Sequence, residues 1–347
     1  MATLTPGAFT YTEWALRHDA SGRIADLVNM LSQNNGILDD TLTVECQSGN
    51  AFEYTQVVKL PAPTRRVYNQ GIPSTLGGVA KLVATCSEYA DWAKYDKSLA
   101  ELGGTLGELR TQEDNLHMEG MSQQVASDLF YANRTSDPTQ FMGLANIYNT
   151  VSTTTSAIAN NVIDCGGTGS VNTSMWLVYW GPKKIHTIFP KGTTAGLQHR
   201  DMGLLPAVDA NGNEYLAYRT YLEWKIGLAI HDWRYAVRAC NIDVTQLAGG
   251  SPPNLINTLV RMGHKTPTAP AGVANVQTTD STVDKVVPGR AAIYCNRTVA
   301  TYLELQAMNK TNVLLKMEEW DGEVVTTFRG IPIRNVDAIV NTETRVV

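Results

Sequence analysis

The sequence lacks any segment that would direct the chain through a membrane or hold it in one. Its first residues contain no basic stretch followed by an apolar one, and no apolar run elsewhere approaches the length that spans a bilayer. We therefore expect a soluble protein that is not secreted and has no membrane partner.

Basic residues are too few for a chain that neutralises phosphate groups by itself. Lys and Arg number 28 against 33 Asp and Glu, so the formal net charge is −5, whereas nucleic-acid binding needs a clustered excess of Lys and Arg. Direct nucleic-acid binding is therefore disfavoured. The composition, 43% hydrophobic and 18% charged, is that of a globular protein with an ordinary core.

Paired cysteine motifs are also missing. The five cysteines are odd in number, widely spaced and without a Cys-x-x-Cys pair. They are Cys46, Cys86, Cys165, Cys240 and Cys295. We expect them to be small buried hydrophobic residues in a protein from a reducing cytoplasm.

No recognisable catalytic or metal-binding motif occurs. His199 and His231 each lie near an Asp but have no two-ligand spacing, which argues against a metal or catalytic site. We interpret His231, on the polar face of a predicted strand, as a solvated imidazole. The segment 166–169 is Gly-rich but no Lys-Ser/Thr follows it, which favours a flexible turn. Neighbouring acids such as Glu113 and Asp114 point in different directions on a helix. We predict no enzyme, no cofactor and no metal.

The first half of the chain is predicted to contain a projecting hairpin and a long helix. Residues 11–31 have helical spacing, and 51–60 is rich in strand-forming residues with a return strand predicted at 66–68. The Pro and Gly content of 61–78 favours a hairpin that projects from the body. The longest helical stretch is 106–133, with acids on the faces away from its apolar stripe.

The second half is predicted to be richer in antiparallel strands. Residues 216–230 alternate between apolar and other residues, and Asn211-Gly212 favours a tight turn to a partner strand from about Leu204. The segment 232–243 is expected to extend or pair with this strand. Other predicted elements are a helix at 253–262, a strand at 291–295, a helix at 297–309 and a hairpin around Asp321-Gly322. The fold class is therefore α+β.

Acids are absent from a segment that directly precedes an acid-rich one. Residues 54–87 contain no Asp or Glu, and residues 88–128 contain nine acids against three bases. The bases of the first segment are Lys59, Arg65, Arg66 and Lys81. A surface normally mixes charges of both signs, so we interpret the two segments as halves of an intermolecular joint; a chance fluctuation on an ordinary surface is the alternative.

The order of these elements resembles that of the major capsid proteins of tailed bacteriophages with the Hong Kong 97-like fold. The sequence as a whole is similar to the podovirus-like capsid proteins among them. The resemblance is carried by Ser127–Asn133 with the exit through Phe141–Leu144, by Ala292–Leu303, and by Phe328–Ile333. It covers nearly the whole chain. Residues 232–243 resemble a closing strand that usually comes later, which indicates a rearranged element order within the same fold.

The resemblance implies four parts. Residues 1–45 are expected to form an N-terminal arm and 46–88 an extended β-hairpin loop. Residues 89–250 would form a peripheral domain whose long spine helix is 106–133, and 251–347 an axial domain.

It also implies a function. The chain would assemble into hexamers and pentamers of the icosahedral shell that encloses the double-stranded DNA genome of a tailed phage. Its location would be the virion, with assembly in the host bacterial cytoplasm. The implied partners are many copies of itself, a portal protein and a separate scaffolding protein, with a decoration protein as an optional addition.

With this resemblance, the two oppositely charged segments are predicted to form an intersubunit interface. The basic hairpin of one subunit is expected to lie over the acidic spine helix of its neighbour. The predicted contact residues are Lys59, Arg65, Arg66 and Lys81 on the hairpin, and Glu108, Glu113, Asp114 and Glu119 on the helix. Two other functions remain open: an encapsulin-type nanocompartment shell, and a soluble hydrolase that uses His199 or His231.

Overall fold

The computed structural model describes residues 32–101, 106–151, 158–209, 211–249, 252–267, 290–308, 315–320 and 323–347. The chain forms two compact units. The first contains Ser87–Val125 and Thr194–Ile226, and the second contains Asn34–Cys86, Ala126–Thr193 and Gly227–Val347. The predicted helix at 11–31 lies outside the described residues. Of the described helices, none is long and apolar enough to cross a membrane.

The second unit is built around a strand that is buried along its whole length, β5 (Asn172–Trp180). Its run of Met, Trp, Leu, Val and Tyr residues suits a strand with both faces covered. β5 lies antiparallel to β9 (Ala236–Asp243) and to β10 (Arg290–Cys295). Beyond β10 the sheet continues through β13 (Ile331–Asn335), β12 (Glu323–Phe328) and β11 (Leu315–Trp320), with β10 and β13 parallel.

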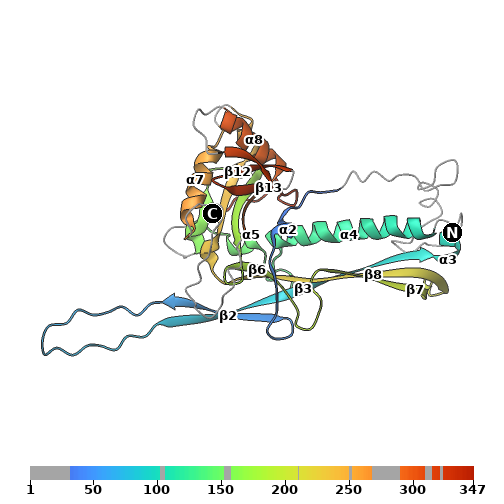
Figure 1. Ribbon diagram of the computed structural model, residues 1–347, viewed down its shortest axis with the longest axis horizontal. Coiled ribbons are helices and arrows are strands. Elements are labelled where there is room, and N and C mark those ends of the chain that lie inside the picture. The colour runs from blue at the N-terminus through green and yellow to red at the C-terminus, as the bar shows by residue number, and fades with distance from the viewer. Residues whose placement is uncertain are drawn as a thin grey trace. The chain divides into compact units, whose positions relative to one another are not determined.

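Two helices cover one face of this sheet (Figure 1). Alternate residues of β5, including Met175, Leu177 and Tyr179, share a buried core with Leu259 of α7 (Leu255–Lys265) and Leu303 of α8 (Arg297–Met308). Shorter elements complete the unit: α2 (Ile37–Asp40), β1 (Thr43–Glu45), α5 (Leu144–Ile147), β4 (Val162–Asp164), β6 (Ile185–Phe189) and α6 (Val244–Leu247). All five cysteines are free, and only Cys165 is not fully buried.

The predicted partner of segment 232–243 is wrong. A short 3-10 helix, η2 (Trp233–Tyr235), turns the chain after β8 (Glu214–Ile230), and β9 then pairs with β4 and β5. Because β5 lies between β9 and β10, residues from both sides of position 250 build one sheet. The four-part domain division and the rearranged element order stay predictions.

A long hairpin extends away from the rest of the second unit (Figure 1). β2 (Ala51–Lys59) pairs antiparallel with the start of β3 (Gly78–Asp96), from Ala51 opposite Thr85 to Lys59 opposite Gly78. The predicted strand 51–60 is thus confirmed, but the return strand is β3 and not 66–68. Pro61, Pro63 and Pro73 lie in the connection, where their missing N–H groups cannot support a ladder.

The first unit contains α3 (Lys97–Glu101), β7 (Leu197–Val208), and parts of β3, β8 and α4 (Leu106–Tyr131). The predicted long helix is confirmed to within two residues at its end. The antiparallel pair β7–β8 is also confirmed, and Gly212 in its turn has a positive φ of 87° that Gly adopts without strain.

One glycine of the second unit determines how the chain leaves α4. Gly143 N–H donates to Ala132 O at 2.8 Å, and a Cβ at Gly143 would lie 2.7 Å from Phe130 O and 2.8 Å from Asp128 O. We expect Gly143→Ala to lower the free energy of unfolding by about 1–3 kcal/mol, because rigid backbone must move to admit the methyl group. Urea unfolding of the full chain measures it.

Gly120→Ala is the matched control. Gly120 lies on α4, and a Cβ there would meet nothing within 4 Å. Alanine favours a helix over glycine by roughly 1 kcal/mol, so this variant should be slightly more stable than the wild type. Equal effects of the two substitutions would contradict the close approach at Gly143.

Candidate interaction surfaces

The basic hairpin has three bases that point into solvent without a carboxylate partner among the described residues. Lys59, Arg65 and Arg66 are exposed, and every residue from 57 to 77 is exposed. Lys81 differs, because its Nζ lies 2.5 Å from Glu53 Oε2 on the same hairpin. The hairpin therefore presents a net positive surface in which Lys81 is already paired.

Large apolar side chains are exposed on the same hairpin. The exposed set is Val57, Val58, Leu60, Val67, Tyr68, Ile72, Leu76 and Val79, with Tyr68 at 93% and Leu76 at 87% exposure. Scattered apolar residues on a surface are normal, but so many on one projecting segment make it a candidate interaction surface. The sequence pattern did not single them out, because most of them lie in the connection between β2 and β3, where no periodic pattern indicates which side chains are covered.

The four predicted acids of α4 have different environments. Glu108 is exposed, whereas Glu113 and Glu119 are half-buried. Asp114 is buried within the first unit, where its carboxylate accepts hydrogen bonds from Tyr95 Oη at 2.8 Å and from Thr220 Oγ1 at 3.3 Å. Burial and the Asp114 carboxylate raise the pKa of Tyr95 far above its usual range.

An open groove of about 630 Å³ lies between β3 and α4 in the first unit. Its walls carry the acids Glu88, Asp91 and Glu113, together with His117. Apolar and neutral groups complete the lining: Tyr89, Ala90, Leu116, Gly120, Met121 and Gln124. The groove suits an extended segment that has both basic and apolar side chains. Glu88 and Asp91 line this groove but were not among the predicted interface residues, although they belong to the acid-rich segment 88–128.

His117 is held against this acidic wall. Its Nδ1 lies 2.5 Å from Asp91 Oδ2, and its Nε2 lies 3.9 Å from Glu113 Oε1. The groove therefore keeps one histidine between two carboxylates on neighbouring elements. Glu88 is more exposed, and its nearest cation is Lys225 at 3.7 Å.

The two histidines considered for hydrolysis lie in different settings. His199 is partly exposed, and its Nε2 lies 3.1 Å from Asp114 Oδ2. His231 is half-buried among aromatic rings, so its interpretation as a solvated imidazole is wrong. Among the residues that the structure describes, no cluster of His, Cys, Asp or Glu is placed to hold a metal ion.

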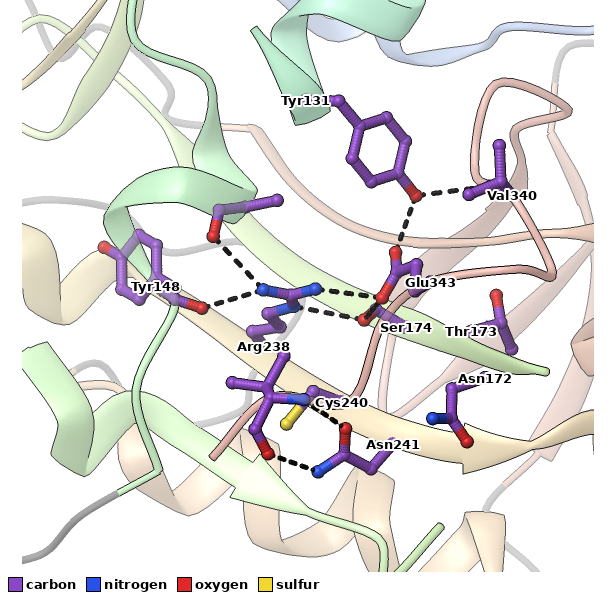
Figure 2. Close-up of polar contacts among 12 residues, drawn as sticks. Tyr131, Tyr148, Asn172, Thr173, Ser174, Arg238, Cys240, Asn241, Val340 and Glu343 are labelled. Carbon is purple, nitrogen blue, oxygen red and sulfur yellow. Dashed lines mark hydrogen bonds and ion pairs between the residues drawn. The ribbon is translucent and has the colours of Figure 1, made fainter. Parts of the chain in front are cut away.

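A buried ion pair fastens the C-terminal segment to the sheet of the second unit (Figure 2). Arg238 Nη2 donates to Glu343 Oε2 at 2.9 Å, and the two side chains are only 4% and 5% exposed. Arg238 also donates to the carbonyl oxygens of Ala145 and Tyr148. The guanidinium donors of Arg238 are therefore used inside the subunit.

The glutamate of this pair is equally well satisfied. Tyr131 Oη donates to Glu343 Oε1 at 2.6 Å, and Ser174 Oγ donates to Oε2 (Figure 2). The Glu343 backbone N–H donates to Asn172 O at 2.9 Å, so the segment is held by main chain and side chain together. Burial and the Glu343 carboxylate raise the pKa of Tyr131 far above its usual range.

Comparison with known proteins gives a family and a full-length structural match. The family model "Major capsid protein GP7" matches residues 19–347. A chain in a near-atomic cryo-EM structure of bacteriophage Epsilon15 is 30% identical, with a TM-score of 0.77, and the match covers 100% of this chain and 99% of that one. No curated protein sequence matches.

Two other solved structures are less similar to this chain. The capsid of Myoviridae phage XM1 is 9% identical with a TM-score of 0.43, covering 68% of this chain and 99% of that one. The holo-SrpI encapsulin complex from Synechococcus elongatus PCC 7942 is 11% identical with a TM-score of 0.40, covering 64% of this chain and 94% of that one.

Proposed function

The chain belongs to the family of major capsid protein GP7, a structural component of the phage virion with the Hong Kong 97-like fold, and from this we propose how its copies assemble. They form hexamers and pentamers, which close into the icosahedral shell around the double-stranded DNA of a tailed phage. An encapsulin-type shell is not favoured, because the matched family is one of major capsid proteins.

The observation that carries this proposal is the exposed hairpin. Residues 57–77 are all exposed, and they combine large apolar side chains with three bases that have no carboxylate partner among the described residues. Burying each such apolar side chain is worth roughly 1.5–3 kcal/mol, so covering the hairpin is a strong drive to association. A shell of many identical copies covers every hairpin in the same way.

The surface that we assign to receive the hairpin is the acidic groove of a neighbouring copy. Lys59, Arg65 and Arg66 would face Glu88, Asp91 and Glu113, while apolar hairpin residues would contact Leu116 and Met121. Individual exposed ion pairs contribute only about 0–1 kcal/mol. The charges therefore set the register and the choice of partner, and the apolar contacts supply most of the affinity.

This proposal modifies the set of interface residues expected from the sequence. Asp114 is buried in its own unit and Lys81 pairs with Glu53 of the same hairpin, so we do not assign them to the joint. Asp91, Glu113 and Glu88 also contact His117 or Lys225, but they line the open groove. Glu108 and Glu119 remain candidates on the same helix, although Glu119 Oε1 also accepts hydrogen bonds from Gln123 and from Gln33 N–H. Glu88 and Asp91 are the additions.

Further partners complete the proposal. The shell encloses DNA without a basic binding patch, since a mildly acidic wall is compatible with DNA that is packaged by a separate motor. We propose a separate scaffolding protein, a portal protein at one vertex and, as an optional addition, a decoration protein, with assembly in the host bacterial cytoplasm.

Electron microscopy of the full chain tests the proposal. Expressed with its neighbouring genes, the chain is expected to form closed icosahedral shells, and expressed alone it is expected to form none, because a separate scaffold is needed to set curvature. Regular closed shells from the chain alone would contradict the separate scaffold. A soluble monomer in every co-expression would contradict shell assembly. Purified particles that contain enzymes in place of DNA would favour the nanocompartment.

A further inference from the structure

The base of the hairpin rests on two stacked histidines. His186 on β6 is fully buried, and His231 directly follows β8. Their ring centroids are 5.1 Å apart with an interplanar angle of 33°. Phe52 of β2 packs edge-on against both rings, at 5.1 Å from His186 and 5.4 Å from His231.

Two further residues of β2 complete the contact. The ring of Tyr54 lies 4.7 Å from that of His231. Gln56 Nε2 donates to His231 O at 2.7 Å and to Ile230 O at 3.2 Å. Below the rings, Phe52 shares a small buried cluster with Cys46, Cys86, Ile188 and Ala229. Phe52, Tyr54 and Gln56, which lie on one face of β2, thus hold the hairpin against the histidine pair and the residues around it.

We propose that the His186–His231 pair is an acid-sensitive latch, which holds the base of the hairpin when both rings are neutral and releases it when they are protonated. Two imidazolium rings stacked at this distance would repel each other in a pocket with little water to solvate them. The least costly way to admit the charge is to lift β2 from the pair.

The charged groups around the pair do not offset such a charge. Lys183 and Lys184 lie on the turn before β6, and both are basic. Asp232 follows His231, but its carboxylate is held by Arg234 at 2.6 Å. On β2, Tyr54 is a neutral phenol whose pKa burial raises further, and Glu53 is paired with Lys81. Cys46 and Cys86 are thiols whose pKa values are raised by burial, so they stay neutral.

The direction of the pH effect follows from the same burial. Burial, and then the neighbouring His231, lower the pKa of His186 from 6.5 to about 4, and burial together with Lys183 lowers the pKa of His231. A histidine whose pKa is lowered in the closed state stabilises that state above its ordinary pKa. The stabilisation is lost as the pH falls from about 6.5 towards 4.

The functional consequence concerns the direction of the hairpin. Because the latch is at its base, release changes how residues 57–77 are presented to a neighbouring molecule. The latch is a property of the single subunit and does not depend on the shell proposal. Its failure in the test below would leave the shell proposal standing, and the reverse also holds.

Thiol labelling of the full chain tests the latch. Cys46 and Cys86 lie under Phe52, so release exposes them, whereas Cys240 and Cys295 are buried elsewhere in the unit and serve as internal controls. Loss of the free thiol on reaction with dithiodipyridine, which reacts in mild acid, is followed by peptide mass spectrometry, and its rate is divided by the rate in urea at each pH. The thiopyridyl adduct and the Cys46–Cys86 disulfide that forms when the neighbouring thiol, 3.6 Å away, displaces thiopyridone both count as reaction. From pH 7.5 to pH 5.0 the relative rate at Cys46 should rise by up to about 30-fold, and at the controls by less than about threefold.

Two variants decide between the latch and general loosening. His186→Phe with His231→Phe removes titration and should keep labelling at Cys46 nearly independent of pH. If that variant does not fold, His231→Arg carries a fixed charge and should label at pH 7.5 as fast as the wild type does at pH 5.0. Unchanged wild-type labelling, an equal rise in the double variant, or a slow His231→Arg variant at pH 7.5 would each overturn the proposal.

Discussion

Reversing the charge of Arg65 and Arg66 together is expected to abolish shell formation while the subunit stays folded. Both side chains are exposed on the hairpin, so Arg65→Glu with Arg66→Glu removes no internal contact. In the proposed joint the new glutamates would face Glu88, Asp91 and Glu113 of a neighbour, and like charges at a docking surface oppose association. We expect the yield of shells seen by electron microscopy to fall at least about tenfold, with an unchanged circular dichroism spectrum.

Two matched variants separate docking from nonspecific effects. Arg65→Lys with Arg66→Lys keeps the charge and should still form shells. Adding Glu88→Lys to the reversed hairpin restores an opposite charge across the joint and should recover part of the yield. If the variant with the reversed hairpin forms shells at the wild-type level, the charge division is a chance fluctuation and has no role in docking.

Removing the carboxylate of Glu343 is expected to give the largest loss of stability. Glu343→Ala leaves the Arg238 guanidinium charged and buried without its counter-ion, and it removes the acceptor of Tyr131 and Ser174. Breaking one partner of a buried pair typically costs about 3–5 kcal/mol, because the remaining charge has neither water nor a counter-ion. Urea unfolding of the full chain should show this loss as a lower midpoint.

An exposed ion pair in the same unit is the control. Lys81 and Glu53 are 61% and 44% exposed, so Glu53→Gln should change the free energy of unfolding by only about 0–1 kcal/mol. Glu343→Gln keeps the size and one acceptor and should fall between the two. If Glu343→Ala proves as mild as Glu53→Gln, the ion pair does not hold the C-terminal segment.

Local pattern was sufficient for the elements whose signal is periodic and long. The helix at 106–133 and the strand at 216–230 were predicted within a few residues of α4 and β8, because an apolar stripe or a strict alternation determines which faces can be buried. The Asn211-Gly212 turn likewise identified β7 as the partner of β8. In these cases the deciding interactions lie within a few residues of one another.

Pairing between distant segments was not predictable in the same way. The return strand was placed at 66–68, but the chain turns there, with Gln70 N–H donating to Val67 O, and β3 begins only at Gly78. The strand 236–243 was expected beside β8 and is found beside β5. Several strands of suitable composition compete for each edge, and only the packing of the whole sheet selects among them.

The interface residues show the same division. Charge along the chain was enough to indicate a basic hairpin and an acidic helix, but not that Asp114 turns inward to Tyr95 or that Lys81 pairs with Glu53. The groove acids Glu88 and Asp91 lie on β3, and their position opposite α4 depends on how strand and helix pack.

By itself, then, the sequence determined the fold class, the family resemblance, the long helix and the division of charge between two adjacent segments. These depend on composition and on contacts that are local in the chain. Only the tertiary structure decided which charges remain available, that Arg238 and Glu343 meet in the core, and that two histidines far apart in sequence stack under the hairpin. The reason is physical: burial and the choice of partner depend on every neighbour in space, and those neighbours come from distant parts of the chain.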